Sequence, residues 1–202
     1  MSIEKSSMSL IDFLKTNGFI ILQKSGNVNW ERLAKIVDES PHERIRDLSP
    51  DFYFIFNDEL KTLLTNLFKE YHLTTFSSNK LLKGVDKRTW HTDYPDVNHP
   101  CVNKNLFTHG IVSVQVIYPL CDFSHENGAT MYVPNSHTLA DRPTDEMFNN
   151  AKTFTLKANE YLVYVGNLWH SQGINLTEKP RSALLANFTH ISVPTKDSTF
   201  LN

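Results

Sequence analysis

The chain has 202 residues, of which 40% are hydrophobic, with 13 Phe and 7 Tyr; this is enough apolar material for one packed core and too little chain for two full-sized domains. Twenty Lys and Arg against 22 Asp and Glu give a net charge of −2, which argues against a protein that holds nucleic acid or a membrane surface through clustered positive charge. The chain has no apolar run long enough for a membrane span, no signal-peptide pattern, and only two cysteines. We therefore expect a soluble, cytoplasmic protein with neither a nucleic-acid nor a membrane partner.

Helical spacing of apolar residues dominates the first seventy positions. Residues 8–16 form an amphipathic pattern that ends at Asn17-Gly18, a left-handed helix stop, and residues 18–23 follow as a short buried strand. Residues 29–40 return to helical spacing. A third helix begins near Asp58, a candidate N-cap, and carries the apolar stripe Leu60, Leu63, Leu64, Leu67 and Phe68.

From His72 onward the apolar period changes to two. The pattern predicts short strands at residues 72–82, 88–94, 111–120, 129–134, 152–157, 160–165 and 181–191. Turn clusters separate them, and the long loops 95–108 and 138–152 are candidates for the rim of a site. We expect a single, mainly β domain, a sandwich or jelly roll, with a helix-rich support at 1–72, a β core at 73–192 and a tail at 193–202.

His91 and Asp93 are the first candidates for chemistry. On a strand, positions i and i+2 share a face, so the imidazole and the carboxylate would project into the same space. Alone, the pair is a weak signal, and a hydrogen-bonded surface pair is its ordinary interpretation. His170 follows the strand at 160–165, and Arg181 opens the last strand, on the same face as Leu185 and Asn187. A guanidinium on a pocket face requires a carboxylate or phosphate, whereas at a strand end it can also reach water.

Together these residues form a recognisable set. Two histidines and one carboxylate bind non-haem Fe(II) on one face and leave the opposite coordination positions open. A 2-oxo acid can chelate two of these positions and O₂ can take the third. Arg181 would then form a bidentate contact with the far carboxylate of a dicarboxylate cosubstrate.

The segment between the two histidines resembles the signature of the phytanoyl-CoA dioxygenase family, in which an Asn-Gly turn precedes a strand that ends in Pro-Gly-Ser-His. The matching residues are Asn127, Gly128, Pro134, Ser136 and His137. The family's His-x-Asp matches His91 and Asp93, and its distal His, Asn and Arg match His170, Asn175 and Arg181. The similarity runs from about residue 73 to 190, and it also includes the strand 18–23 with its flanking helices.

This resemblance implies a double-stranded β-helix (jelly-roll, cupin-like) core with the N-terminal helices packed on it. It implies Fe(II) held by His91, Asp93 and His170, and 2-oxoglutarate held by Arg181. The expected activity is that of an oxidoreductase, a dioxygenase that uses O₂ to hydroxylate an unactivated C–H and releases succinate and CO₂. The chain departs from the family at Asn135, where Gly is usual, and at Gln172, which stands near a family hydroxyl that contacts the cosubstrate.

Four further residues are weaker candidates. Gln115 shares a strand face with Ile117 and either orients 2-oxoglutarate or the substrate or is a satisfied core side chain. Gln172 is a second candidate for 2-oxoglutarate. His137 is a candidate for contact behind the metal ligands or for a purely structural role in its turn. Tyr94, at the end of the predicted strand 88–94, is a candidate substrate contact.

The sequence does not identify the primary substrate or the oligomeric state. A small soluble molecule is the default expectation. The basic residues Lys80, Lys83, Lys87 and Arg88 make an anionic or carrier-tethered substrate the alternative, although a solvated charged face is the ordinary interpretation. The competing classes of function are a non-catalytic, cupin-like metal- or ligand-binding module and a zinc hydrolase, which would leave Arg181 without a role.

Overall fold

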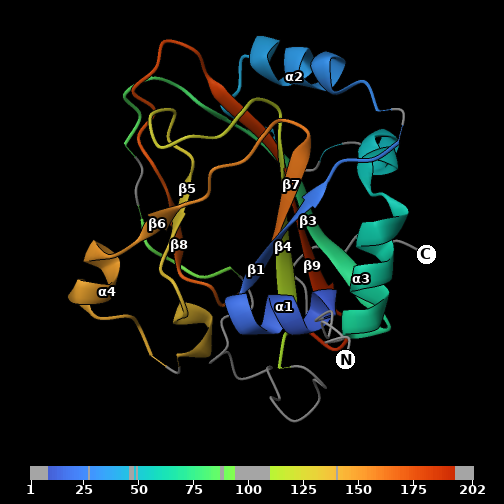
Figure 1. Ribbon diagram of the computed structural model, residues 1–202. Coiled ribbons are helices and arrows are strands. Elements are labelled where there is room, and N and C mark those ends of the chain that lie inside the picture. The colour runs from blue at the N-terminus through green and yellow to red at the C-terminus, as the bar shows by residue number, and fades with distance from the viewer. Residues whose placement is uncertain are drawn as a thin grey trace, which may run out of the picture.

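The computed structural model describes residues 9–26, 28–45, 48, 50–86, 89–93, 110–139 and 141–193 (Figure 1). Two antiparallel sheets form the body of the fold. The larger sheet has the strand order β1 (Phe19–Gln23), β7 (Glu160–Val165), β4 (Ser113–Pro119), β9 (Arg181–His190), β3 (Tyr71–Leu81) and β2 (Arg44–Ile45). The smaller sheet has the order β6 (Lys152–Thr153), β5 (Thr130–Tyr132) and β8 (His170–Gln172). This arrangement confirms the mainly β, jelly-roll prediction.

The N-terminal helices cover the outer face of the larger sheet (Figure 1). They are α1 (Leu10–Asn17), α2 (Trp30–Glu39) and α3 (Asp58–Phe68), and short 3-10 turns lie at Pro50–Ile55 and Ser136–Thr138. Asparagine, not the predicted Asp58, caps α3, because the Asn57 side chain accepts a hydrogen bond from the Leu60 backbone N–H at 2.9 Å. Gly18 ends α1 at φ 79°, as predicted. The α3 stripe is buried at all five predicted positions.

Successive side chains on β4 and β9 face alternately toward the hydrophobic core and toward a cavity. Val114, Val116 and Phe188 belong to the face that packs with the helices in one hydrophobic core. Gln115, Ile117 and Asn187 belong to the opposite face, which lines a cavity between the sheets. Both faces are therefore buried, which explains why β4 and β9 consist almost entirely of buried residues.

Several local predictions are wrong. Over residues 89–93 the predicted strand 88–94 is reduced to an isolated bridge between His91 and His170. β8 lies between the predicted strands 160–165 and 181–191, where the sequence predicts no strand. The predicted loop 138–152 contains a short helix, α4 (Asp145–Asn149). Lys80 is buried rather than solvated, since its Nζ donates to the carbonyl oxygens of Asp38 and Ser40. Loop 95–108 lies outside the described residues, as do Lys87, Arg88 and all of the tail except Val193.

The family-like turn at Asn127-Gly128 fixes the edge of the smaller sheet. The Asn127 side chain accepts from Ser124 N and donates to Asp122 O, and Gly128 adopts φ 76°. Asn175 donates to the carbonyl oxygens of Leu81 and Lys179, which ties the β8–β9 connection to the end of β3. Asn135 adopts φ 62°, the left-handed conformation that its place in the family pattern requires.

We expect Gly128→Ala to lower the free energy of unfolding by about 3 kcal/mol, because a Cβ would strain the positive φ and meet the Asn175 backbone nitrogen at 2.7 Å. Gly84→Ala is the matched control. Gly84 has φ +71° but no atom within 4 Å of the added Cβ, so only the conformational cost of about 1 kcal/mol remains. Urea unfolding measures both changes, and equal losses would show that the contact with Asn175 carries no cost.

In the described part of the chain, no helix combines the length and the apolar character that crossing a membrane requires.

Candidate metal centre

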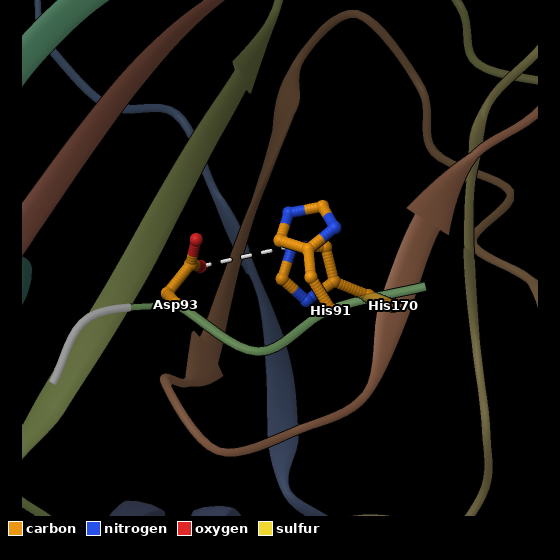
Figure 2. Close-up of side chains that lie close together, drawn as sticks. All are labelled: His91, Asp93 and His170. Carbon is orange, nitrogen blue, oxygen red and sulfur yellow. Dashed lines mark ion pairs between the residues drawn. The ribbon is translucent and has the colours of Figure 1, made fainter. Parts of the chain in front are cut away.

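His91, Asp93 and His170 lie close together (Figure 2), and all three line the cavity between the sheets. One potential ligand atom from each lies within 4.8 Å of those of the other two. The two imidazole rings are 4.3 Å apart between centroids, and His170 Nε2 is 3.8 Å from Asp93 Oδ2. This spacing allows one ion to contact all three residues after small side-chain adjustments.

Backbone hydrogen bonds set the relative positions of the three residues. His91 N donates to His170 O at 3.1 Å, and His170 N donates to His91 O at 3.0 Å. Asp93 N donates to the Gly166 carbonyl at 2.7 Å. The segment that carries His91 and Asp93 is therefore fastened to the β7–β8 turn and to the start of β8, without a continuous strand.

Both histidines present a nitrogen lone pair to the centre. Nδ1 of His91 lies 2.7 Å from Thr89 O, and Nδ1 of His170 lies 2.9 Å from Leu168 O. A carbonyl only accepts, so each Nδ1 carries the proton and each Nε2 carries the lone pair, which on His170 lies 3.1 Å from the Tyr164 hydroxyl. Burial lowers the pKa of His170, and His91 acts in the same direction while Asp93 opposes it. His170 is therefore neutral at pH 7, the form that binds metal.

Asp93 is the anionic member of the group. Its Oδ2 is buried and has no hydrogen-bond partner. Burial of a carboxylate oxygen lowers the stability of the fold unless a cation or a hydrogen-bond donor contacts that oxygen. The donor set of two neutral imidazoles and one unsatisfied carboxylate thus fits a divalent metal.

Arg181 lines the same cavity, which measures about 520 Å³. Its side chain is 2% exposed, and the guanidinium carbon lies 4.6 Å from the centroid of the Phe123 ring. Burial lowers the pKa of Arg181 to about 10, which leaves it protonated at neutral pH. The Nε–H has no acceptor, so this buried cation still has a donor to offer to an anion.

The cavity contains most of the residues that the sequence singles out. Gln115 and Gln172 line it together with His91, Asp93, His170 and Arg181. Gln172 pairs with Thr130 across the smaller sheet, and both face the cavity. Their contacts with 2-oxoglutarate stay predictions. Tyr94 lies outside the described residues.

His137 does not line the cavity, so the structure gives no support to its predicted role behind the metal ligands. Its ring packs against Gly18, and its Nε2 lies 3.1 Å from Lys15 O at the end of α1. The turn that contains Ser136 and His137 nevertheless contacts the segment just before His170. Asn167 Nδ2 donates to His137 O, and Trp169 N donates to Ser136 Oγ at 2.9 Å, so the turn holds the segment that leads into His170.

Sequence reasoning missed a polar row that crosses the larger sheet. Tyr164, Gln115, Asn187 and Thr75 are direct cross-strand neighbours on β7, β4, β9 and β3, and all four line the cavity. Asn187 is 6% exposed and its Oδ1 has no partner. Strand alternation was a usable signal for Asn187, which shares a face with Arg181, but the pairing of four strands is not visible in the sequence.

The chain matches the phytanoyl-CoA dioxygenase (PhyH) family over residues 24–183, a span that contains all three candidate ligands and Arg181. It belongs to this family. The family span also takes in α2, α3 and the smaller sheet, so it covers the scaffold as well as the site.

The chain is also similar to curated proteins. The uncharacterized protein Rv1501 of Mycobacterium tuberculosis is 24% identical over 172 residues, 80% of this chain and 60% of that protein. Dioxygenase af480 of Aspergillus fumigatus is 32% identical over 126 residues, 60% of this chain and 38% of that protein. The chain therefore spans less than two thirds of the length of these curated relatives.

The fold is shared with HygX from Streptomyces hygroscopicus, whose crystal structures include one with iron bound and one with nickel and 2-oxoglutarate bound. The TM-score with the iron-bound structure is 0.71 at 16% identity, over 92% of this chain and 88% of HygX.

Proposed function

We propose that the protein is an Fe(II)- and 2-oxoglutarate-dependent dioxygenase that hydroxylates a C–H bond of a small organic substrate and releases succinate and CO₂. The observation that carries the proposal is the placement of His91, Asp93 and His170 in a cavity that also contains the buried, incompletely satisfied cation of Arg181. Membership of the phytanoyl-CoA dioxygenase family supports it, as does the iron and the 2-oxoglutarate in crystal structures of the structurally similar HygX.

In this proposal His91 Nε2, His170 Nε2 and one Asp93 oxygen hold the iron. The Thr89 and Leu168 carbonyls accept from the two Nδ1–H groups and so fix the tautomers and the ring orientations. Three protein ligands leave coordination positions open for a chelating 2-oxo acid and for O₂. When bound, iron and 2-oxoglutarate supply O₂ activation coupled to oxidative decarboxylation.

Arg181 is the anchor for the distal carboxylate of 2-oxoglutarate. The guanidinium is already desolvated and held against Phe123, so a carboxylate that replaces water there forms charge-assisted hydrogen bonds without reorganising the site. Gln115 and Gln172 are neutral groups that can orient the cosubstrate from opposite walls. Ile117 and Leu185 form the apolar surface between the polar groups and limit the access of water.

The substrate in this proposal is a small organic molecule that enters the cavity. The structure of HygX with nickel, 2-oxoglutarate and hygromycin B is consistent with a site of this fold that takes a small molecule. An anionic or carrier-tethered substrate remains the alternative. The cytoplasmic location and the substrate contact of Tyr94 also stay predictions.

Turnover of carboxyl-labelled 2-oxoglutarate tests the proposal. We expect the Fe(II)-loaded protein to release labelled CO₂ and an equal amount of succinate in air, slowly without a substrate and faster with one. The variant His170→Ala, and the wild type without O₂, should release neither. A protein that binds iron and 2-oxoglutarate yet forms no succinate with any small molecule would instead be a binding module.

The aromatic ring of Phe148 contacts the residue before each of the two histidine ligands. Phe148 of α4 packs against Trp90 at 5.1 Å and Trp169 at 5.9 Å between ring centroids, and these two residues immediately precede His91 and His170. We expect Phe148→Ala to weaken Co(II) binding about tenfold, because it loosens both ligand-bearing segments at once. Met147→Ala on the same helix is the control. Calorimetric titration that gives the same Co(II) affinity for the two variants would contradict this role.

A further inference from the structure

Tyr164 is a buried polar residue at the metal centre to which the sequence gives no role. It lies on β7 with 3% exposure, and its ring centroid is 4.9 Å from that of His170. The hydroxyl oxygen lies 3.1 Å from His170 Nε2. Because His170 Nδ1 uses its proton on Leu168 O, Nε2 is the acceptor and Tyr164 is the donor.

This hydrogen bond uses the lone pair that a metal would need. The Tyr164 O–H and a metal ion cannot share His170 Nε2, so a metal that binds there displaces the hydroxyl from its acceptor. The displaced hydroxyl would be a buried donor without a partner, which is costly, and it therefore has to find a new acceptor within reach.

Asp93 offers that acceptor. Its Oδ2 lies 3.8 Å from the nitrogen that Tyr164 now contacts, and a carboxylate that gives one oxygen to a metal keeps its other oxygen as an acceptor. A neutral, protonated phenol next to a carboxylate is a donor suited to it.

We propose that Tyr164 is a positioning residue for Asp93: metal binding moves its O–H from His170 Nε2 to the Asp93 oxygen that does not bind the metal. This inference rests on the proposed metal site. The hydrogen bond holds Asp93 as a one-oxygen ligand, because the second oxygen is engaged by the phenol. A carboxylate held in this way keeps an additional coordination position free for the cosubstrate or O₂.

Tyr164→Phe tests this role, with Co(II) as a spectroscopic probe added to the full-length, metal-free protein. We expect Co(II) to bind about tenfold more weakly, and its visible spectrum to lose intensity as Asp93 becomes a two-oxygen ligand and the coordination number rises. Tyr161→Phe is the matched control. It removes a hydroxyl on the same strand that donates to Asn57 Oδ1 at 3.3 Å, outside the cavity, and should leave affinity and spectrum unchanged.

The outcomes separate this inference from the metal site on which it rests. Unchanged or tighter Co(II) binding by Tyr164→Phe with a wild-type spectrum would overturn the role of Tyr164 while leaving the site intact. A lower unfolding midpoint of the metal-free variant with unchanged Co(II) affinity and spectrum would show a packing role only, and would also overturn it. A wild-type protein that binds no Co(II) would overturn the metal site itself.

Discussion

Asp93→Asn should weaken the binding of a divalent metal by more than about a hundredfold. The substitution keeps the shape of the side chain but removes the one anionic ligand, and changes to residues behind metal ligands already cost about ten- to a hundredfold. Isothermal titration with Fe(II) under anaerobic conditions, or with Co(II) in air, measures the loss.

The stability of the metal-free variant provides a second observable. Asp93 Oδ2 is buried and unsatisfied, so removal of its charge should leave the free energy of unfolding unchanged or raise it. Asp122→Asn is the control, because it removes the charge of a carboxylate that has partners and lies outside the cavity. Asp122 pairs with Lys157 Nζ at 2.9 Å and accepts a hydrogen bond from Ala158 N at 2.8 Å. Asp93→Asn that destabilises the metal-free protein but binds metal normally would mean that Asp93 is structural.

Arg181→Met should weaken 2-oxoglutarate binding by about a hundredfold or more and leave metal affinity unchanged. The loss corresponds to two charge-assisted hydrogen bonds from a desolvated guanidinium. Arg181→Lys keeps the charge without the bidentate geometry and should fall between the wild type and Arg181→Met. Tryptophan fluorescence or calorimetry on the metal-loaded protein measures the affinity for 2-oxoglutarate.

The cavity offers a direct control for this assignment. Arg44 of β2 also lines it, and its partner on β3 across the sheet edge is Asn79. If Arg181 is the anchor, Arg44→Met changes 2-oxoglutarate affinity by less than about threefold. A large loss of 2-oxoglutarate affinity in Arg44→Met together with a small loss in Arg181→Met would show that Arg44, not Arg181, binds the distal carboxylate.

Sequence reasoning succeeds where one element carries the signal. The stripe on α3, the division of β9 into a cavity face and a core face, and the Gly18 stop each depend on local spacing, and the structure confirms them. His91, Asp93, His170 and Arg181 were selected by chemistry and by the family pattern, and all four share one cavity.

The misses have a common physical cause. β8 exists because it pairs with β5, which lies far away along the chain, although its own residues give no strong strand signal. At His91 the reverse holds: the β-rich pattern predicts a strand, but the pairing is limited to one bridge with His170. Tyr164 and Asn187 reach the site through strand pairing, which no local pattern shows. His137 does not line the cavity, and its ring packs beside Gly18. Local patterns identify elements, but the register between them decides which side chains meet.

Anaerobic visible absorption of the Fe(II)-loaded protein, titrated with 2-oxoglutarate, tests the central claim most directly. We expect a charge-transfer band that saturates with the cosubstrate, is absent in His170→Ala, and requires much more 2-oxoglutarate in Arg181→Met. A folded wild-type protein with bound iron that shows no band at saturating 2-oxoglutarate would contradict the claim that the cavity brings this metal and this cosubstrate together.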